Sequence, residues 1–346
     1  MKNQLTEREG RMMGQTGTGL NIVVTMPLNE AQKRKLTEKA PEANWQWCEG
    51  GWFRGEKEAL LFQADIILGN VKVPSQLKEA KRLKWIQLNN AGTEGYAGPG
   101  ALPEGVLLTN ATGAYGPAIS EHMLACLLML WKKLPLYYAH QMEGIWKPEG
   151  HVRAIEGCTV LCVGMGDIGS AFAFRMKALG AHTIGIRRRT SDKPDYVDEL
   201  HTAEALDTLL PRADVIALSL PGNGATKHMF DAHRLSLCKK DACLINVGRG
   251  SAVDTEVLCR MLLEGRLGSA ALDVTDPEPL PEGHPLWKAP NLILTPHVSG
   301  GFSLPETLER IVGICADNLE RFLCGEKLYN LVDTETGYAS NGRKSV

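Results

Sequence analysis

The segment with the clearest chemical meaning is a run of glycines between an apolar stretch and a helix-like stretch, from Gly157 to Leu179. Its glycines have the spacing GxGxxG, which suits phosphate binding. The first glycine permits a tight turn, the second lets the backbone approach a pyrophosphate, and the third lets the helix pack closely on the strand. GxGxxG alone is weak evidence, but strand, turn and helix follow here in the required order. The segment therefore predicts a dinucleotide site, formed by Gly164, Met165, Gly166, Asp167, Ile168 and Gly169.

An arginine cluster follows at the end of the next predicted strand. Proteins that bind NAD usually have an Asp or Glu there, about 20 residues after the glycines, which accepts a hydrogen bond from the ribose 2'-hydroxyl. This chain instead has Arg187, Arg188 and Arg189. Guanidinium groups can hold a 2'-phosphate through charge-assisted hydrogen bonds, so the sequence predicts a preference for NADP(H), with NAD(H) as the second cofactor. The alternative is a solvated basic turn.

Three further segments place charged or titratable residues where predicted strands end. Arg249 stands between two glycines, Glu278 lies in a proline-rich acidic loop, and His297 ends the sequence Thr-Pro-His. Open α/β sheets bind their ligands at the carboxyl ends of the strands. Taken singly, each segment also fits a plainer role: a surface arginine in a turn, an acidic loop, or a histidine that caps a loop.

The elements that must position these residues form two alternations of apolar and charged segments. In the first, we predict strands at 22–26, 60–68 and 85–88 and helical segments at 29–40 and 75–83. In the second, we predict strands at 159–163, 183–186, 214–218, 243–247, 270–274 and 292–294. Such alternation indicates two α/β units with parallel sheets and helices on both faces.

Two longer helices are also predicted. Apolar residues recur at helical spacing between Pro117 and His140, which indicates one long, mostly buried helix. A second stretch, from Pro305 to Leu323, carries one apolar face that can close back onto the first unit. We expect residues 1–20 to form a disordered extension and residues 333–346 a loose polar tail.

Composition excludes several classes of protein. The 346 residues suffice for about two domains. A net charge of −2 gives no electrostatic reason to expect nucleic acid or an anionic membrane as a partner. The longest apolar run, Met123 to Trp131, has nine residues, about half of what a bilayer-spanning helix needs. We therefore expect no membrane association.

The nine cysteines are spread along the chain without any CxxC pair, so we interpret them as reduced core residues and predict no metal site. The polar N-terminus lacks the apolar region of a signal peptide. Both observations predict a cytoplasmic protein.

In their order and spacing, these motifs closely resemble those of the D-isomer-specific 2-hydroxyacid dehydrogenase family. The resemblance covers about residues 21 to 332 and is carried, besides the glycine run, by 90–93, 109–113, 120–122, 246–250, 272–287 and 295–297. It implies a Rossmann-type doubly wound parallel sheet inserted into a flavodoxin-like substrate domain. The dinucleotide-binding domain would be 117–303, and the substrate domain would combine 21–116 with 304–332. Members of the family are usually homodimers, so the resemblance also implies a homodimer.

Carried over to this sequence, the resemblance implies that Arg249, Glu278 and His297 are the catalytic residues. Reduction of a 2-keto acid builds negative charge on the carbonyl oxygen, which calls for a proton donor and a cation. His297 would donate the proton, and Glu278 would orient it and favour its charged form. Arg249 would bind the substrate carboxylate and polarise the carbonyl, a two-contact task that suits a planar guanidinium.

The resemblance also implies further contacts with both ligands. The substrate carboxylate would meet the backbone amides of Ala91, Gly92 and Thr93. Asp273 would hold the nicotinamide carboxamide. The remaining cofactor contacts would be Leu220, Pro221, Thr226 and Val247.

The predicted function is that of an NAD(P)-dependent oxidoreductase acting on CH–OH groups, which reduces a small 2-keto acid of the glyoxylate or hydroxypyruvate class. An NAD-dependent phosphoglycerate dehydrogenase is one alternative, disfavoured by Arg187. A formate- or phosphite-type dehydrogenase is another. The alternative outside the enzymes is a binding protein that senses dinucleotides, similar to a transcriptional corepressor.

Overall fold

The computed structural model describes residues 19–188, 192–302, 304–335, 337 and 339. It divides the chain into two units, where the sequence predicted divisions after residues 116 and 303. Unit 1 takes in the chain up to Ala114 and from Leu304 onward, and unit 2 takes in Tyr115–Ser303. Arg189 and most of the predicted N-terminal extension lie outside the described residues.

Unit 1 is built on a parallel sheet with the strand order β2-β1-β3-β4-β5, which is the order of flavodoxin-like folds. Its strands are β1 (Asn21–Val24), β2 (Asn44–Trp47), β3 (Ile66–Leu68), β4 (Trp85–Gln87) and β5 (Leu107–Thr109). Its helices are α2 (Glu30–Thr37), α3 (Glu58–Gln63) and α10 (Pro305–Leu323), with 3-10 turns at Glu49–Gly51, Gly55–Lys57 and Pro74–Glu79.

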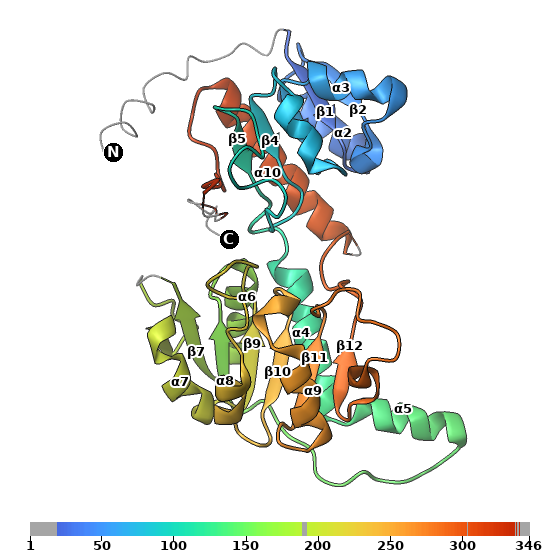
Figure 1. The fold of residues 1–346 in the computed structure, drawn as a ribbon, viewed down its shortest axis with the longest axis vertical. Helices are drawn as coiled ribbons and strands as arrows, with labels where there is room; N and C mark the ends of the chain where they lie inside the picture. Colours follow the sequence, from blue (N-terminus) through green and yellow to red (C-terminus); the bar gives the residue numbers. More distant parts are fainter. Residues whose placement is uncertain (1–18, 189–191, 303, 336, 338, 340–346) are drawn as a thin grey trace. The chain divides into compact units, whose positions relative to one another are not determined.

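Helix α10 returns from the far end of the sequence and completes the core of unit 1 (Figure 1). The apolar face that the sequence predicted is buried, and Phe322 on this face stacks on Trp85 of β4 with 5.5 Å between the ring centroids. Asn318 donates a hydrogen bond to the buried side chain of Gln87 at 2.9 Å. Both contacts fix α10 on the sheet.

Unit 2 is built on a parallel sheet with the strand order β12-β11-β10-β9-β6-β7-β8. Its strands are β6 (Thr159–Val163), β7 (His182–Arg187), β8 (Glu199–Thr202), β9 (Val215–Leu218), β10 (Cys243–Asn246), β11 (Ser269–Leu272) and β12 (Leu292–Leu294). The order reverses between β6 and β9, as in doubly wound dinucleotide-binding folds. The predicted α/β, Rossmann-like fold class is therefore confirmed.

The helices of unit 2 flank this sheet, except α5, which extends away from it (Figure 1). They are α4 (Gly116–Trp131), α5 (Leu134–Glu143), α6 (Asp167–Ala178), α7 (Leu206–Leu209), α8 (Ala232–Leu237) and α9 (Thr255–Leu263). Short 3-10 turns lie at Ala203–Ala205, Leu210–Arg212, Gly250–Ala252 and Pro285–Lys288. Asp231 and Asp254 accept hydrogen bonds from the first turns of α8 and α9, which satisfies amides that have no partner within the helix.

The single long helix predicted over 117–140 is wrong, because the chain forms α4 and then α5. Lys133 adopts a left-handed conformation with a φ of 57°, and Pro135 stands in the first turn of α5. Proline has no amide hydrogen to continue the helix and disfavours a helical conformation in the residue before it. The predicted burial holds for much of α4, whereas no residue of α5 is buried.

Other predicted elements of unit 1 also differ. The apolar segment 60–68 is divided between α3 and β3, and the segment 75–83 contains only the 3-10 turn Pro74–Glu79. Strands β2 and β5 of unit 1 and β8 of unit 2 were not predicted. Every residue of β8 is half-buried at one edge of its sheet, which explains why the strand lacks the apolar run that marked its neighbours.

The segment after residue 332, predicted as a loose tail, makes hydrogen bonds where it is described. The carbonyl of Thr334 accepts from the Gly98 amide at 2.8 Å, and that of Gly337 accepts from the Thr93 hydroxyl at 3.0 Å. Across the described ranges, no helix combines the length and the apolar character that a bilayer crossing requires.

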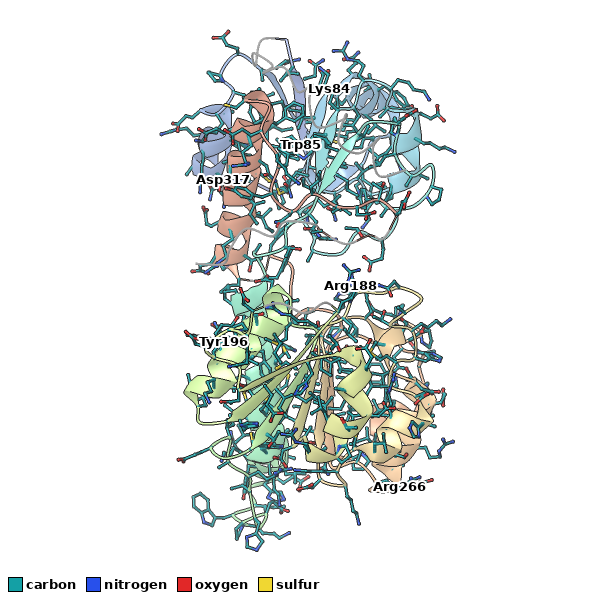
Figure 2. All side chains as sticks on the ribbon, turned by 90° about the vertical axis from the view of Figure 1, so that its left-hand side faces the viewer. Lys84, Trp85, Arg188, Tyr196, Arg266 and Asp317 are labelled. Carbon is teal, nitrogen blue, oxygen red and sulfur yellow. The ribbon has the colours of Figure 1, made fainter. Side chains whose placement is uncertain are left out.

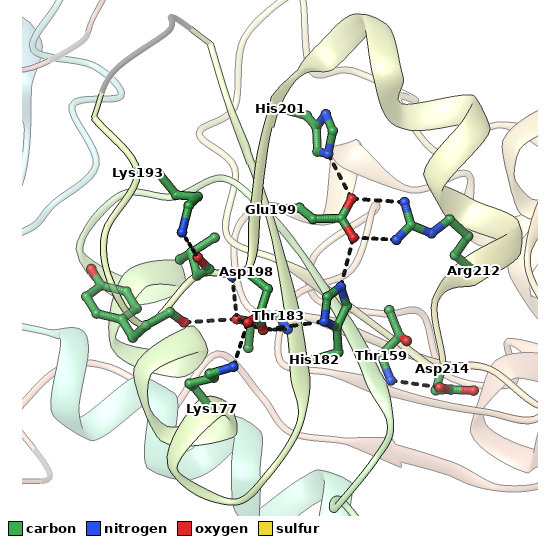
Figure 3. Close-up of polar contacts among 12 residues, drawn as sticks. Thr159, Lys177, His182, Thr183, Lys193, Asp198, Glu199, His201, Arg212 and Asp214 are labelled. Atoms are coloured by element: carbon green, nitrogen blue, oxygen red, sulfur yellow. Dashed lines mark hydrogen bonds and ion pairs between the residues drawn. The ribbon is translucent and has the colours of Figure 1, made fainter.

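A polar cluster joins α6, β7 and β8 (Figure 3). The Asp198 carboxylate accepts two hydrogen bonds: Oδ1 accepts one from Lys177 Nζ at 2.6 Å, and Oδ2 accepts one from the Thr183 amide at 2.8 Å. Burial by itself would raise the pKa of Asp198, but the hydrogen bonds from Lys177 and Thr183 outweigh it and lower the pKa to about 2. Next to it, hydrogen bonds from the Arg212 guanidinium lower the pKa of Glu199. The cluster thus favours the ionised carboxylates.

Replacing Asp198 with asparagine is expected to lower the free energy of unfolding at pH 7 by up to about 2 kcal/mol. An aspartate in an unfolded chain has a pKa of about 3.9. The stabilisation by the ionised Asp198 carboxylate is therefore complete above that pH and is lost as the pH falls toward about 2. Urea unfolding at pH 7 and pH 3 measures this, and the gap between variant and wild type should shrink at pH 3. The exposed Glu156→Gln serves as control, and a gap independent of pH would contradict the prediction.

Candidate active site

The predicted dinucleotide segment forms a tight turn between β6 and α6. Gly164 has a φ of 102°, and a Cβ there would lie 2.8 Å from the Ser219 carbonyl oxygen. A Cβ at Gly169 would overlap the carbonyl oxygen of Gly164. At Gly166, by contrast, a Cβ would have no atom within 4 Å. Gly164 and Gly169 therefore allow close packing, whereas Gly166 leaves the backbone open at the start of α6.

This arrangement fits the pyrophosphate of a dinucleotide. Gly166 is the residue that precedes α6, and it has no side chain to cap the first amides of that helix. Such amides, together with the helix dipole, attract an anion. Of the neighbouring residues, Met165 is buried and Ile168 is half-buried.

Asp167 has a contact that the sequence did not suggest. Its Oδ2 accepts hydrogen bonds from the amides of Tyr115 at 3.2 Å and Gly116 at 2.9 Å, at the start of α4. A Cβ at Gly116 would come within 2.6 Å of the Asp167 carboxylate. The residue therefore ties the start of α4 to the dinucleotide turn.

The two described arginines of the cluster stand at the carboxyl end of β7. Arg187 is the last residue of that strand and is half-buried, and Arg188 follows it and is exposed. Figure 2 shows Arg188 at the opposite end of unit 2 from Arg266. The pair thus lies at the sheet edge where the dinucleotide turn also lies.

The remaining predicted cofactor residues follow the next strands. Leu220 and Pro221 come after β9, and Val247 comes directly after β10 and is buried. Thr226 is buried, and its hydroxyl donates to the carbonyl of Pro221 at 2.6 Å. Thr226 therefore closes the turn that begins at Pro221.

The three predicted catalytic residues follow the neighbouring strands β10, β11 and β12. Nδ1 of His297 lies 2.7 Å from Oε1 of Glu278, and both side chains are close to half exposed. Among the residues that the structure describes, Nε2 of His297 has no hydrogen-bond partner. The carboxylate thus orients the ring and leaves the second nitrogen for another contact.

Arg249 is held by its glycine neighbours and by Asn246. A Cβ at Gly250 would overlap the carbonyl of Thr275, and one at Gly248 would lie 2.6 Å from the backbone of Leu220. Asn246 donates to the Arg249 carbonyl at 3.0 Å and accepts from the Gly248 amide at 3.1 Å. The loop with Arg249 therefore packs closely against the loops that follow β9 and β11.

Asp273, the first residue after β11, is buried with an exposed fraction of 2%. Its carboxylate accepts hydrogen bonds from Thr295, Val298 and Ser299, on both sides of His297. The sequence offered a signal for this contact, since Thr295 and Ser299 place hydroxyl groups two residues before and after the histidine.

The predicted substrate loop, Ala91 to Thr93, belongs to unit 1. Asn110 holds it by donating to the Ala91 carbonyl at 2.7 Å. In the described part of the chain, the amides of Ala91, Gly92 and Thr93 donate no hydrogen bond. Three amides in succession can hold an anion such as a carboxylate.

Residues 124–299 match the family model described as "D-isomer specific 2-hydroxyacid dehydrogenase, NAD binding domain". A glyoxylate reductase from Thermofilum pendens is 32% identical over 288 residues, which cover 81% of this chain and 82% of that protein.

Two solved structures are similar over nearly their full length. A D-isomer specific 2-hydroxyacid dehydrogenase family protein from Aeromonas salmonicida is 32% identical with a TM-score of 0.80, and the match covers 92% of this chain and all of that one. A D-isomer specific 2-hydroxyacid dehydrogenase from Xanthobacter autotrophicus, in complex with NADPH and MES, is 27% identical with a TM-score of 0.77. That match covers 93% of this chain and all of the Xanthobacter chain.

Proposed function

The chain belongs to the D-isomer-specific 2-hydroxyacid dehydrogenase family, and from this premise we propose that it reduces a small 2-keto acid of the glyoxylate or hydroxypyruvate class. As a member, it is an oxidoreductase that binds a nicotinamide dinucleotide and acts on CH–OH groups. The observation that carries the proposal is the 2.7 Å contact between Nδ1 of His297 and Glu278, which leaves Nε2 for the substrate. The similar protein from Thermofilum pendens, named a glyoxylate reductase, supports the substrate class.

A nicotinamide dinucleotide held by the turn from Gly164 to Gly169 would supply the hydride that reduction of C2 of the keto acid requires. Nε2 of His297 donates its proton to the carbonyl oxygen, which becomes the hydroxyl of the product. Glu278 accepts the Nδ1 hydrogen and stabilises the charged imidazole before the transfer. In the opposite direction, neutral His297 takes the hydroxyl proton.

Arg249 binds the substrate carboxylate and polarises the carbonyl in the same proposal. A guanidinium can make both contacts at once because its donors lie in one plane. For the amides of Ala91, Gly92 and Thr93 in unit 1, which donate no hydrogen bond among the described residues, we propose carboxylate binding as well. A positive charge and several amides together offset the cost of removing the carboxylate from water.

A panel of 2-keto acids, assayed with NADPH and with NADH by absorbance, tests the proposed function. Turnover of glyoxylate or hydroxypyruvate above larger 2-keto acids is expected. Oxidation of phosphoglycerate, formate or phosphite in its place would select one of the alternative dehydrogenases. Lack of turnover with every substrate would favour the dinucleotide-sensing protein.

We propose NADP(H) as the preferred cofactor because Arg187 ends β7, the strand after the dinucleotide turn, and Arg188 follows it. Replacing Arg187 with aspartate removes a charge-assisted hydrogen bond and adds repulsion to the 2'-phosphate. The kcat/KM for NADPH should therefore fall by about tenfold to a hundredfold, with a smaller change for NADH. Steady-state kinetics with both cofactors measure this.

The matched control is Arg266→Asp, at the opposite end of unit 2 (Figure 2), which should leave both values unchanged. If the wild type uses NADH better than NADPH, the proposed preference is wrong.

We propose a homodimer formed through α5 and the segment after it. The apolar run of α4 does not offer such a contact, because Met123, Leu127 and Trp131 are buried within unit 2. Large exposed apolar side chains gather in the next segment: Leu134, Leu136, Tyr138, Met142, Ile145, Trp146 and Val152. Patches of this kind mark interfaces with other proteins.

The double variant Tyr138→Glu with Met142→Glu should shift the protein from dimer to monomer, because it places two charges in the apolar contact. Light scattering after size-exclusion chromatography gives the mass directly. Leu263→Glu, at an exposed position in α9, is the control and should remain dimeric. A monomeric wild type would refute the assembly.

We also propose a cytoplasmic location. The nine cysteines are free, and eight of them are buried. Burial raises the pKa of Cys162 to about 12, so its thiol resists oxidation. Reduced thiols support a reducing compartment.

A further inference from the structure

The segment after Val332, which the sequence predicted as a loose tail, contacts the predicted substrate loop, Ala91 to Thr93, within unit 1. We propose that residues 333–337, here called the C-terminal turn, belong to the substrate site because they hold this loop in place before the keto acid binds. The inference rests on the proposed function, which assigns the amides of the loop to the substrate carboxylate. It makes the end of the chain a determinant of affinity for the keto acid.

The C-terminal turn is closed by its own hydrogen bonds. The Gly337 amide donates to the Asp333 carbonyl at 2.8 Å, and the Glu335 amide donates to Oδ1 of Asp333 at 2.9 Å. Beyond the turn, Ala339 forms an antiparallel bridge with Val332, whose amide donates to a carbonyl of β5 at 2.8 Å. The chain therefore folds back on itself and is attached to the sheet of unit 1.

Two carbonyls of the C-terminal turn hold the end of the substrate loop and the turn that follows it. The Thr93 hydroxyl donates to the Gly337 carbonyl at 3.0 Å, and the Gly98 amide donates to the Thr334 carbonyl at 2.8 Å. Between these points, the amides three and four residues after Thr93 donate to its carbonyl at 3.0 and 3.1 Å. Because Thr93 is buried, its hydroxyl is largely shielded from water, and the hydrogen bond to Gly337 fixes its side chain.

The start of the substrate loop is held by the residues just before the C-terminal turn. Asn110 donates to the Ala91 carbonyl at 2.7 Å. The buried side chain of Asn330 donates in turn to the carbonyls of Asn110 at 3.1 Å and Thr112 at 2.7 Å. The chain from 330 to 337 thus supports the substrate loop at both ends. A loop that is ordered before binding loses less conformational freedom when the ligand binds, which raises affinity.

Gly337 permits the close approach of the C-terminal turn to Thr93. Its φ is 71°, in the left-handed region that favours glycine, and a Cβ there would lie 3.2 Å from Oγ1 of Thr93. A larger side chain at this position would displace either Thr93 or the carbonyl that Thr93 contacts. Gly105, also in unit 1, has a similar φ of 84°, but a Cβ there would have no atom within 4 Å. The two glycines therefore form a matched pair of test positions.

The decisive variant is Gly337→Val, which leaves every residue of the substrate loop unchanged. The KM for glyoxylate should rise about tenfold while kcat stays within about twofold, because the loop then becomes ordered only when the carboxylate binds. The Kd for NADPH, titrated by fluorescence without substrate, should not change. In the cofactor-free protein, hydrogen exchange at the amides of Tyr96 and Ala97, which donate to the Thr93 carbonyl, should become faster. A merely structural role would lower the amount of folded enzyme and leave KM unchanged.

The control variant Gly105→Val should lower Tm and leave the KM for glyoxylate unchanged. Two shortened chains complete the test. A chain that ends at Asp333 lacks both carbonyls but keeps the buried Val332, so its KM should rise by tenfold or more. A chain that ends at Ala339 keeps both carbonyls and should have the KM of the wild type.

The proposal is overturned if the chain that ends at Asp333 keeps the wild-type KM, or if the chain that ends at Ala339 has an equally raised KM. It is also overturned if Gly337→Val lowers kcat without raising KM, or if hydrogen exchange at Tyr96 and Ala97 stays as in the wild type. Failure of the proposed function is a separate result, because it would be seen as absent turnover by the wild type with every 2-keto acid.

Discussion

Replacing His297 with alanine is expected to lower kcat in both directions by about 10²- to 10⁴-fold, which is the usual contribution of a positioned proton donor. The variant deletes the group that gives a proton to the carbonyl oxygen and takes it back in the reverse reaction. Binding of NADPH should change little, because the loop backbone around residue 297 keeps its hydrogen bonds to Asp273. Stopped-flow and steady-state assays in both directions measure the effect.

The partner variant Glu278→Gln separates orientation from charge. Glutamine keeps the shape and can still accept the hydrogen of Nδ1, but it no longer stabilises a charged imidazole. Reduction, which starts from protonated His297, should therefore lose more than oxidation at neutral pH. The exposed His233→Ala controls for loss of a histidine elsewhere in unit 2. Equal losses in both directions would require another partner for His297.

Replacing Arg249 with lysine is expected to lower kcat/KM for the keto acid by about tenfold to a hundredfold. Lysine keeps the positive charge but cannot contact the carboxylate and the carbonyl from one plane. The KM should rise and kcat should fall together, because Arg249 acts in substrate binding and in the transition state. The Kd for NADPH should not change.

Arg260→Lys, on α9, is the control for the same change at a position outside the loops of the site. Near-normal kinetics in Arg249→Lys would mean that the guanidinium only supports the loop between Asn246 and Gly250. In that case the substrate carboxylate would need another cation.

The sequence predicted every strand of the unit 2 sheet except β8, because each of the other six is an apolar run bounded by turn residues. The predicted strands 159–163 and 292–294 agree with β6 and β12 residue for residue. The long helix failed at Pro135, where a local rule about proline should have outweighed the apolar periodicity. Strand β2 was missed because its tryptophans, Trp45 and Trp47, alternate with polar residues over only four positions.

The contacts of the candidate active site could also be predicted only in part from the sequence. The contact between Glu278 and His297 was predicted from the resemblance. The two residues are 19 positions apart and lie in the loops that follow two neighbouring strands. The hydrogen bond between His122 and Thr295 spans 173 residues, and no pattern of spacing predicts such a pair. The hydrogen bonds that the Asp273 carboxylate accepts from Thr295, Val298 and Ser299 likewise become visible only in the folded loop.

The return of α10 to unit 1 has a consequence for how the protein is made. The strands of unit 1 up to Ala114 are translated before unit 2. Helix α10, which stacks on Trp85, is translated only about 200 residues later. Unit 2 is continuous in sequence and can complete its core during that interval. The sheet of unit 1 therefore stays without α10 while unit 2 folds. During this interval its apolar surface is exposed, and chaperones that bind such surface can act on the nascent chain.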